Sequence, residues 1–135
     1  MPSMAVAEII DVTPWEGFTL TNGTDVKLGP VITPNGPCSV EVLDANLRLI
    51  HHTRILLETN IPGRFRHLSL RADRLSLQLP ESAVAGQIIM PASSLPVLAL
   101  QGNQAINTQL QDGRLVIQTR SVRRDEDRAI DVVLP

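Results

Sequence analysis

The sequence is poor in aromatic side chains. It has no tyrosine, and the aromatic residues of its 135 positions are limited to Trp15, Phe18 and Phe65. Sugar-binding proteins commonly stack their ligands on aromatic rings, so this composition argues against a lectin-like role. The core must instead be built from Val, Ile and Leu, which are typical of closely interdigitated β-strands.

Cysteine and lysine are each present only once. Cys38 is the single cysteine, so no disulfide can form within the chain, and Lys27 is the single lysine among 12 basic residues. The others are arginines, whose planar side chains suit two-pronged ion pairs at interfaces. The net charge of −2 provides no broad positive field for nucleic acid. We therefore expect no nucleic-acid partner.

Signals for export and membrane insertion are also missing. The stretch from Met1 to Ile10 lacks the basic start and apolar run of a signal peptide. No later stretch approaches the roughly 18 consecutive apolar residues of a membrane span. We expect a protein made in the cytoplasm, without a membrane partner and not secreted by a signal peptide.

Motifs for catalysis and cofactor binding are absent. The sequence has no Gly-x-Ser-x-Gly, no Cys-x-x-Cys, no EF-hand pattern and no Gly-rich phosphate loop. Catalytic triads assemble from distant residues, so this lowers the expectation of an enzyme without excluding one. We predict no catalytic residues, no cofactor and no metal site.

The histidines offer the one alternative to that prediction. A cupin-like metal site uses a His-x-His pair with a later Glu, and His51, His52 and Glu58 match this arrangement only in part. Adjacent residues on a strand point to opposite faces, so His51 and His52 are not expected to bind one metal together. His67 is the remaining histidine that a third ligand position could use. A cupin-like metal-dependent enzyme stays open as an alternative.

From Cys38 onward, apolar residues recur at alternate positions, which is the spacing of a strand with one buried face. The alternation is clearest over residues 75–79, where leucines alternate with polar residues. Around Leu43 and Asp44 the spacing slips by one residue, and we expect a β-bulge there.

Turn signals divide the rest of the chain. Asp112-Gly113 between two alternating runs predicts a hairpin, because both central residues of a type I′ turn need positive φ. We expect an antiparallel meander from Leu95 to Ser121 around it. Asn60-Ile61-Pro62-Gly63 predicts another turn, Ser82 to Ala85 one helical turn, and Ala129 to Leu134 the final strand.

These elements predict an all-β fold. About nine or ten short strands without an amphipathic helix are typical of an antiparallel sandwich or a jelly-roll-like domain. We assign residues 38–135 to this β-sandwich body and residues 1–37 to an extended N-terminal arm.

The arm contains more apolar surface than a solvated linker would. Four prolines and four glycines between Asp11 and Pro37 interrupt regular strands. The same stretch carries Val12, Trp15, Phe18 and other apolar residues that need a cover. Two covers are open at this stage, the domain's own sheet and a neighbouring subunit.

The densest basic patch lies between Arg64 and Arg74. If Arg64 and Arg66 leave one face of a strand together, they could pair with acidic groups of a neighbour. A solvated strand face that keeps the protein soluble is the alternative reading of this patch.

Together these features predict a non-enzymatic structural or assembly subunit. Its most concrete form is a capsid-decorating or cement protein of a virus-type particle, located in the virion, whose partners are copies of itself, for example in a trimer, and a neighbouring shell subunit. An intracellular module that binds a peptide or protein is a further alternative. The predicted interface residues are Val12, Trp15, Phe18, Leu20, Arg64 and Arg66.

Overall fold

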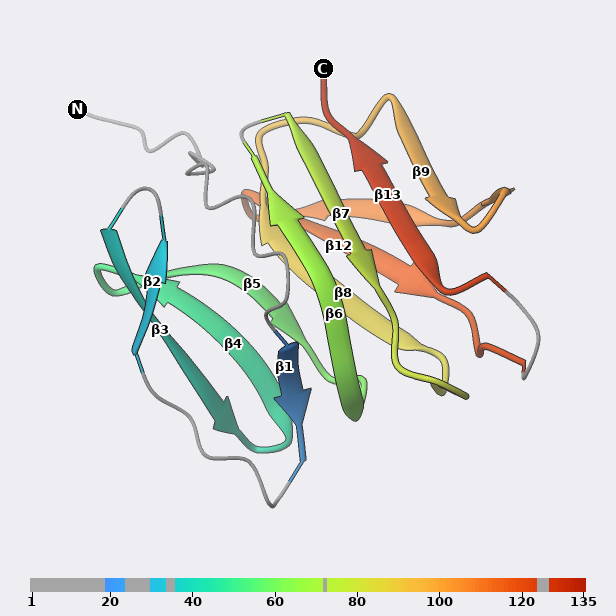
Figure 1. Cartoon of the computed structure of the whole chain (residues 1–135). Coiled ribbons are helices and arrows are strands. Elements are labelled where there is room, and N and C mark those ends of the chain that lie inside the picture. The colour runs from blue at the N-terminus through green and yellow to red at the C-terminus, as the bar shows by residue number, and fades with distance from the viewer. Residues whose placement is uncertain (1–18, 24–29, 34–35, 72, 124–126) are drawn as a thin grey trace.

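The chain folds into two antiparallel β-sheets that pack face to face, as Figure 1 shows. The computed structural model describes residues 19–23, 30–33, 36–71, 73–123 and 127–135, of which residues 19, 20, 30–33, 36 and 37 are described by their backbone alone. No helix occurs in these ranges, so none of the described residues belongs to a helix that could span a membrane. The predicted all-β sandwich is confirmed.

Sheet A has six strands in the described part of the chain. Their order across the sheet is β1 (Thr19–Asn22), β6 (Gly63–Leu70), β7 (Arg74–Gln78), β13 (Ala129–Val133), β9 (Leu98–Gln101) and β10 (Gln104–Ala105). The final strand of the chain, β13, therefore lies in the middle of sheet A, paired with β7 and β9.

Sheet B has seven strands among the described residues. Their order is β11 (Thr108–Gln111), β12 (Arg114–Thr119), β8 (Gly86–Pro91), β5 (Arg54–Thr59), β4 (Asn46–His51), β3 (Gly36–Leu43) and β2 (Pro30–Thr33). The strands β8, β5, β4 and β3 form its central part, and β11 and β2 are its edges.

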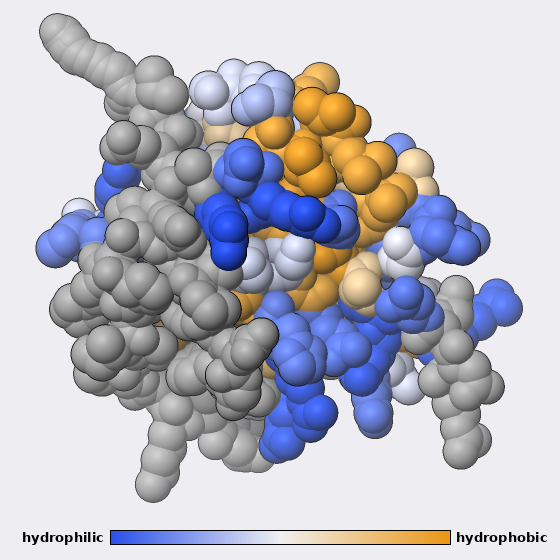
Figure 2. Space-filling model, turned by 45° about the horizontal axis from the view of Figure 1, so that its top comes forward, coloured by the Kyte–Doolittle hydropathy of each residue, from blue (hydrophilic) through white to orange (hydrophobic). Residues whose placement is uncertain are grey.

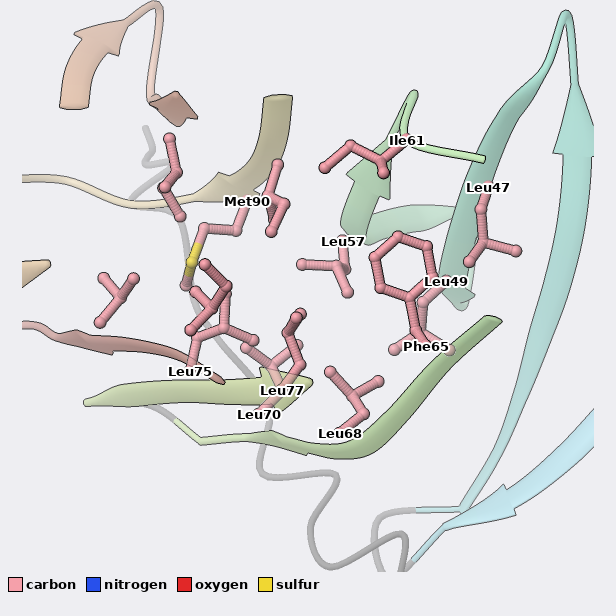
Figure 3. Close-up of a cluster of buried hydrophobic side chains, with 14 of the residues drawn as sticks. Leu47, Leu49, Leu57, Ile61, Phe65, Leu68, Leu70, Leu75, Leu77 and Met90 are labelled. Carbon is pink, nitrogen blue, oxygen red and sulfur yellow. The ribbon is translucent and has the colours of Figure 1, made fainter. Parts of the chain in front are cut away.

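The core lies between the sheets and is almost entirely aliphatic. Leucines at alternate positions of β7 are buried, as their spacing predicted. Figure 3 shows side chains of sheet B, among them Leu47, Leu49 and Leu57, facing those of sheet A. Phe65 is the single aromatic among the described buried core residues. The expectation of a core built from Val, Ile and Leu is confirmed.

Residues 19–22 and 30–33, both within the predicted arm, are edge strands of the sheets. Strand β1 pairs with β6 in sheet A, and β2 pairs with β3 in sheet B. These two pieces therefore gain backbone hydrogen bonds within their own chain. The predicted boundary at residue 37 divides β3, which begins at Gly36.

The predicted hairpin at Asp112-Gly113 is confirmed, whereas the predicted bulge at Leu43 and Asp44 is wrong. Asp112 and Gly113 have φ of 52° and 76° and join β11 to β12. Asp44 and Ala45 have φ of 52° and 67°, so they form a second two-residue turn, which places Leu43 opposite Asn46. The one-residue change in the spacing of apolar residues is explained by this reversal of the chain, because both strands of a hairpin can direct their apolar residues to one face.

Irregularities of register do occur, but in β5 and β6. In β5 the register against β4 shifts between Leu49 and Ile50, which leaves Leu56 as the extra residue. In β6 it shifts between Arg66 and Ser69, and His67 there has φ of 55°. Neither irregularity interrupts the alternation strongly enough to be seen in the sequence.

The predicted meander from Leu95 to Ser121 is also wrong. Strands β9 and β10 form a hairpin in sheet A, while β11 and β12 form a hairpin in sheet B. The chain crosses between the sheets at Ile106 and Asn107. The Ile106 amide donates to Ala99 O, and Asn107 O accepts from the Gln118 amide. Alternation predicts strands, but the packing of their apolar faces decides which sheet each hairpin joins.

The helical turn expected over Ser82 to Ala85 does not form, and the chain turns at Glu81 and Ser82 instead. The Ala83 amide donates to the Pro80 carbonyl at 3.3 Å, and Ser82 has φ of 54°, outside the right-handed helical region.

The connector from Asn60 to Pro62 carries the chain from sheet B to sheet A. Ile61 is fully buried, and its carbonyl accepts a hydrogen bond of 2.8 Å from Asn22 Nδ2. Thr59 Oγ1 donates to the Gln87 carbonyl at 2.8 Å, and Gln87 N donates to Asn60 Oδ1 at 2.9 Å. These bonds join β1, β5 and β8 around one connector.

Gly63, which follows this connector, should tolerate no side chain. Its φ is +118°, and an added Cβ would lie 2.6 Å from the Cβ of Pro80. Gly63→Ala should lower the free energy of unfolding by about 3 kcal/mol, through backbone strain and overpacking. Urea unfolding measures this. Gly23→Ala is the matched control, since no described atom outside its two chain neighbours lies within 4 Å of its added Cβ; equal losses in both variants would contradict the prediction.

Candidate functional site

Arg64 and Arg66 project from the outer face of sheet A. Both are exposed, and the residue between them, Phe65, is buried in the core. In the register with β1, Arg64 lies opposite Thr21 and Arg66 opposite Thr19. The two guanidinium groups therefore leave one face together, which is the geometry needed for a joint interaction with carboxylates. Their role in an interface stays a prediction.

The other predicted interface residues lie at or beyond the start of the described chain. Leu20 lies in β1 opposite Phe65. Val12, Trp15 and Phe18 fall outside the described residues.

The histidines do not assemble into a site. His51 ends β4, whereas His52 lies in the two-residue turn that follows, with φ of 52°, so the expectation of two adjacent strand positions is wrong. His67 lies in sheet A, in the sheet opposite His51. No group of three or more His, Cys, Asp or Glu side chains in the described part of the chain could hold a metal ion.

Glu58, the acidic residue of the partial cupin-like pattern, is used in an ion pair. Arg48 Nε donates to Glu58 Oε2 at 2.5 Å, and Arg48 Nη1 lies 3.6 Å from Glu41 Oε1. The hydrogen bond to Glu58, together with the charges of both carboxylates, raises the pKa of Arg48. The three residues form a charged row across β3, β4 and β5, with Glu41 opposite Arg48 and Arg48 opposite Glu58.

A second ion pair lies on the outer face of sheet A. Arg74 on β7 bonds both oxygens of Asp131 on β13, at 2.8 and 2.7 Å. The hydrogen bonding and the charge of Asp131 raise the pKa of Arg74. Because this arginine already has a carboxylate partner, Arg64 and Arg66 are the better candidates for contact with another molecule.

His51 is a buried polar residue whose ring nitrogens form no hydrogen bond with the described residues. It is 6% exposed, and neither Nδ1 nor Nε2 has a hydrogen-bond partner among the described residues. Its ring contacts that of His52 edge to face, with centroids 4.1 Å apart. The register between β3 and β4 pairs Ser39 with Ile50, so buried Cys38 is the next cross-strand neighbour of His51.

An exposed apolar strip lies before and within β9 in the described part of the chain. It consists of Leu95, Val97 and Leu98, which are 54%, 69% and 43% exposed. Figure 2 shows hydrophobic side chains gathered in one part of the visible surface. The Val97 amide donates to Val133 O at 2.8 Å, which fixes the strip against β13. We refer to these three residues as the apolar strip.

The apolar strip was not among the predicted interface residues. Its signal in the sequence was Leu95-Pro96-Val97-Leu98, a short apolar run with a proline near its start. The sequence of such a run is equally typical of a buried strand and of an exposed one. Its exposure follows from its position at one end of β9.

His51 provides a test that separates a structural histidine from a ligand. Replacing it by leucine removes two polar atoms that have no hydrogen-bond partner in the described part of the chain, so His51→Leu should raise the free energy of unfolding by about 1 kcal/mol. Asn22→Leu is the contrasting control, because Asn22 is equally buried but bonds Ile61 O; it should destabilise the protein. Urea unfolding measures both variants. Stoichiometric metal in the purified protein that is lost in His51→Leu would contradict the structural role and revive the cupin-like alternative.

Comparisons with known proteins assign the chain to no family. No protein-family model matches it, and neither a curated protein nor a solved structure matches significantly. A functional proposal must therefore be drawn from the surfaces described above.

Proposed function

We propose that this chain is a structural subunit that associates with copies of itself through the apolar strip. The supporting observation is the exposure of three large apolar side chains, Leu95, Val97 and Leu98, within four consecutive positions. Contiguous exposed apolar surface in a folded protein commonly marks a protein contact. Each 100 Å² of apolar area that association removes from water contributes about 2.5 kcal/mol before ordering costs.

The proposed occupant of the strip is the N-terminal segment, residues 1–18, of a neighbouring copy. This segment precedes β1 and contains the apolar residues Val12, Trp15 and Phe18. Strand β1 is at one edge of sheet A, and β9 lies near the opposite edge. Six strands span about 24 Å, while 18 extended residues reach about 60 Å. The segment is thus long enough to leave its own subunit and contact the next one.

In its most concrete form the proposal is a decorating or cement protein on a virus-type particle. Repeated copies would be joined by the N-terminal segments, and Arg64 and Arg66 would contact carboxylates of a neighbouring shell subunit. The common outward direction of these two arginines supports this part of the proposal.

Val97→Asp tests the strip. Val97 is the most exposed of the three residues, so the substitution should leave the fold intact while it places a charge in the contact. We expect the self-association constant to fall at least about tenfold, measured by sedimentation velocity over a range of concentrations. Val84→Asp is the matched control, since Val84 is 55% exposed and lies in the loop between β7 and β8. A wild-type protein that stays monomeric at the highest concentration would overturn the proposal.

Removal of residues 1–18 tests the occupant. The truncation keeps every described strand, whereas a cut at residue 36 would remove β1 and β2. We expect a folded monomer that binds a synthetic peptide of residues 1–18, and weaker peptide binding when the truncated chain also carries Val97→Asp. Fluorescence anisotropy of the labelled peptide measures this. If the truncated chain unfolds, or if it still associates, the segment is not the occupant of the strip.

A further inference from the structure

Strand β11 is an exposed edge of sheet B in the described part of the chain. Its sequence, Thr-Gln-Leu-Gln, has no charged residue and no proline, and its register with β12 is regular. Gln109, Leu110 and Gln111 are exposed. The other edge of this sheet, β2, begins with Pro30. Proline, charge and a bulge are common means by which a sheet edge is kept from pairing with another chain, and β11 has none of them.

The main-chain groups of Thr108 and Leu110 point away from sheet B. The Gln118 amide donates to the Asn107 carbonyl at 2.9 Å, which makes these two residues a hydrogen-bonded pair of the hairpin. Such pairs alternate along antiparallel strands, so the odd-numbered residues of β11 direct their main-chain groups to β12. The N–H and C=O groups of the even-numbered residues are therefore directed to the outer edge.

The side chain of Leu110 is only partly covered. Leu110 lies opposite Leu115, which is fully buried, so it faces the space between the two sheets. At the edge of the sheet it remains 39% exposed. A further strand beside β11 would remove this side chain from water and would also bind the outward main-chain groups.

We propose that β11 pairs antiparallel with β11 of a second copy, about a two-fold axis. In the register that uses strand residues alone, Thr108 lies opposite Leu110 of the second copy, and Gln109 lies opposite its own equivalent on the axis. Thr108 and Leu110 then form hydrogen-bonded pairs, each of which exchanges both N–H···O bonds. Each Leu110 side chain packs against a Thr108 side chain, and sheet B continues from one copy into the next.

A second copy fits this edge better than a longer extended chain does. The Ile106 amide already donates to Ala99 O, and Asp112 lies in the turn with φ of 52°. A longer partner would therefore gain no further bonds beyond β11. Because β11 has no charge, two copies meet without repulsion, and Asp112 of one copy lies beside the uncharged Ile106 and Asn107 of the other.

The contact is small and therefore weak on its own. Pairing of two four-residue strands buries much less than the roughly 1,200 Å² of stable complexes, and we expect a dissociation constant of about 1 mM. It becomes effective where an assembly already holds copies close together. The pairing does not depend on the apolar strip, and the truncated chain that lacks residues 1–18 remains a monomer at micromolar concentrations.

Introduced cysteines test the register in the full-length protein. Across the two-fold axis, the Cα atoms at position 109 should lie about 4.5 Å apart, a distance that a disulfide spans. Those at position 111 should lie more than about 13 Å apart. In a glutathione buffer, Gln109→Cys should therefore give a disulfide-linked dimer in at least about tenfold higher yield than Gln111→Cys. Non-reducing electrophoresis measures the yield.

Gln111→Cys is the matched control for Gln109→Cys. Both glutamines are exposed on one strand, and Gln111 Nε2 donates to Gln109 Oε1 at 2.9 Å, a bond that either variant removes. The wild-type protein gives the background, because its single cysteine, Cys38, is buried. Equal yields at the two positions, or no dimer above this background, would overturn the proposal.

Two double variants distinguish this contact from the apolar strip. Leu110→Pro removes an outward amide and no bond of the hairpin, so Gln109→Cys should lose its cross-link when Leu110→Pro is added; urea unfolding verifies the fold. Val97→Asp should leave the yield ratio between positions 109 and 111 unchanged. A cross-link that persists in folded Leu110→Pro, or a ratio that falls to one with Val97→Asp, would contradict pairing through β11.

Discussion

Burial of two aliphatic faces against each other is the interaction on which this fold depends. The contact between the sheets removes the inward leucines of β7 and the inward residues of β5 and β8 from water. The described core holds a single aromatic ring, so aliphatic side chains supply most of its buried apolar surface. Aliphatic contacts are not directional, so they stabilise the sandwich without specifying how its two sheets are aligned. The alignment must come from groups that do have direction.

Polar side chains at the ends of the strands supply that direction. Asn22 binds the connector between the sheets, Thr59 binds β8, and Gln101 binds the backbone beyond β12. Thr119 bonds both the amide and the carbonyl of Gly86, at 3.2 Å each. All four side chains are buried, where a polar group without a partner would be costly. A shift of one sheet along the other would break the bond from Asn22 to the Ile61 carbonyl and the pair of bonds between Gln101 and the backbone of Arg120. The bonds of Thr59 and Thr119 instead join strands within sheet B.

Local pattern was enough to predict the all-β class, the strand at residues 75–79, the final strand and the Asp112-Gly113 hairpin. Each of these depends on alternation or turn chemistry within a few residues. Local pattern did not predict three other features. These are the turn at Asp44-Ala45, the division of β9 to β12 between two sheets, and the exposure of the apolar strip. They depend on which apolar faces meet across the core, and those contacts join residues far apart in the chain. Gln101 and Arg120 illustrate the difference: neither is distinctive in the sequence, and packing alone makes them neighbours.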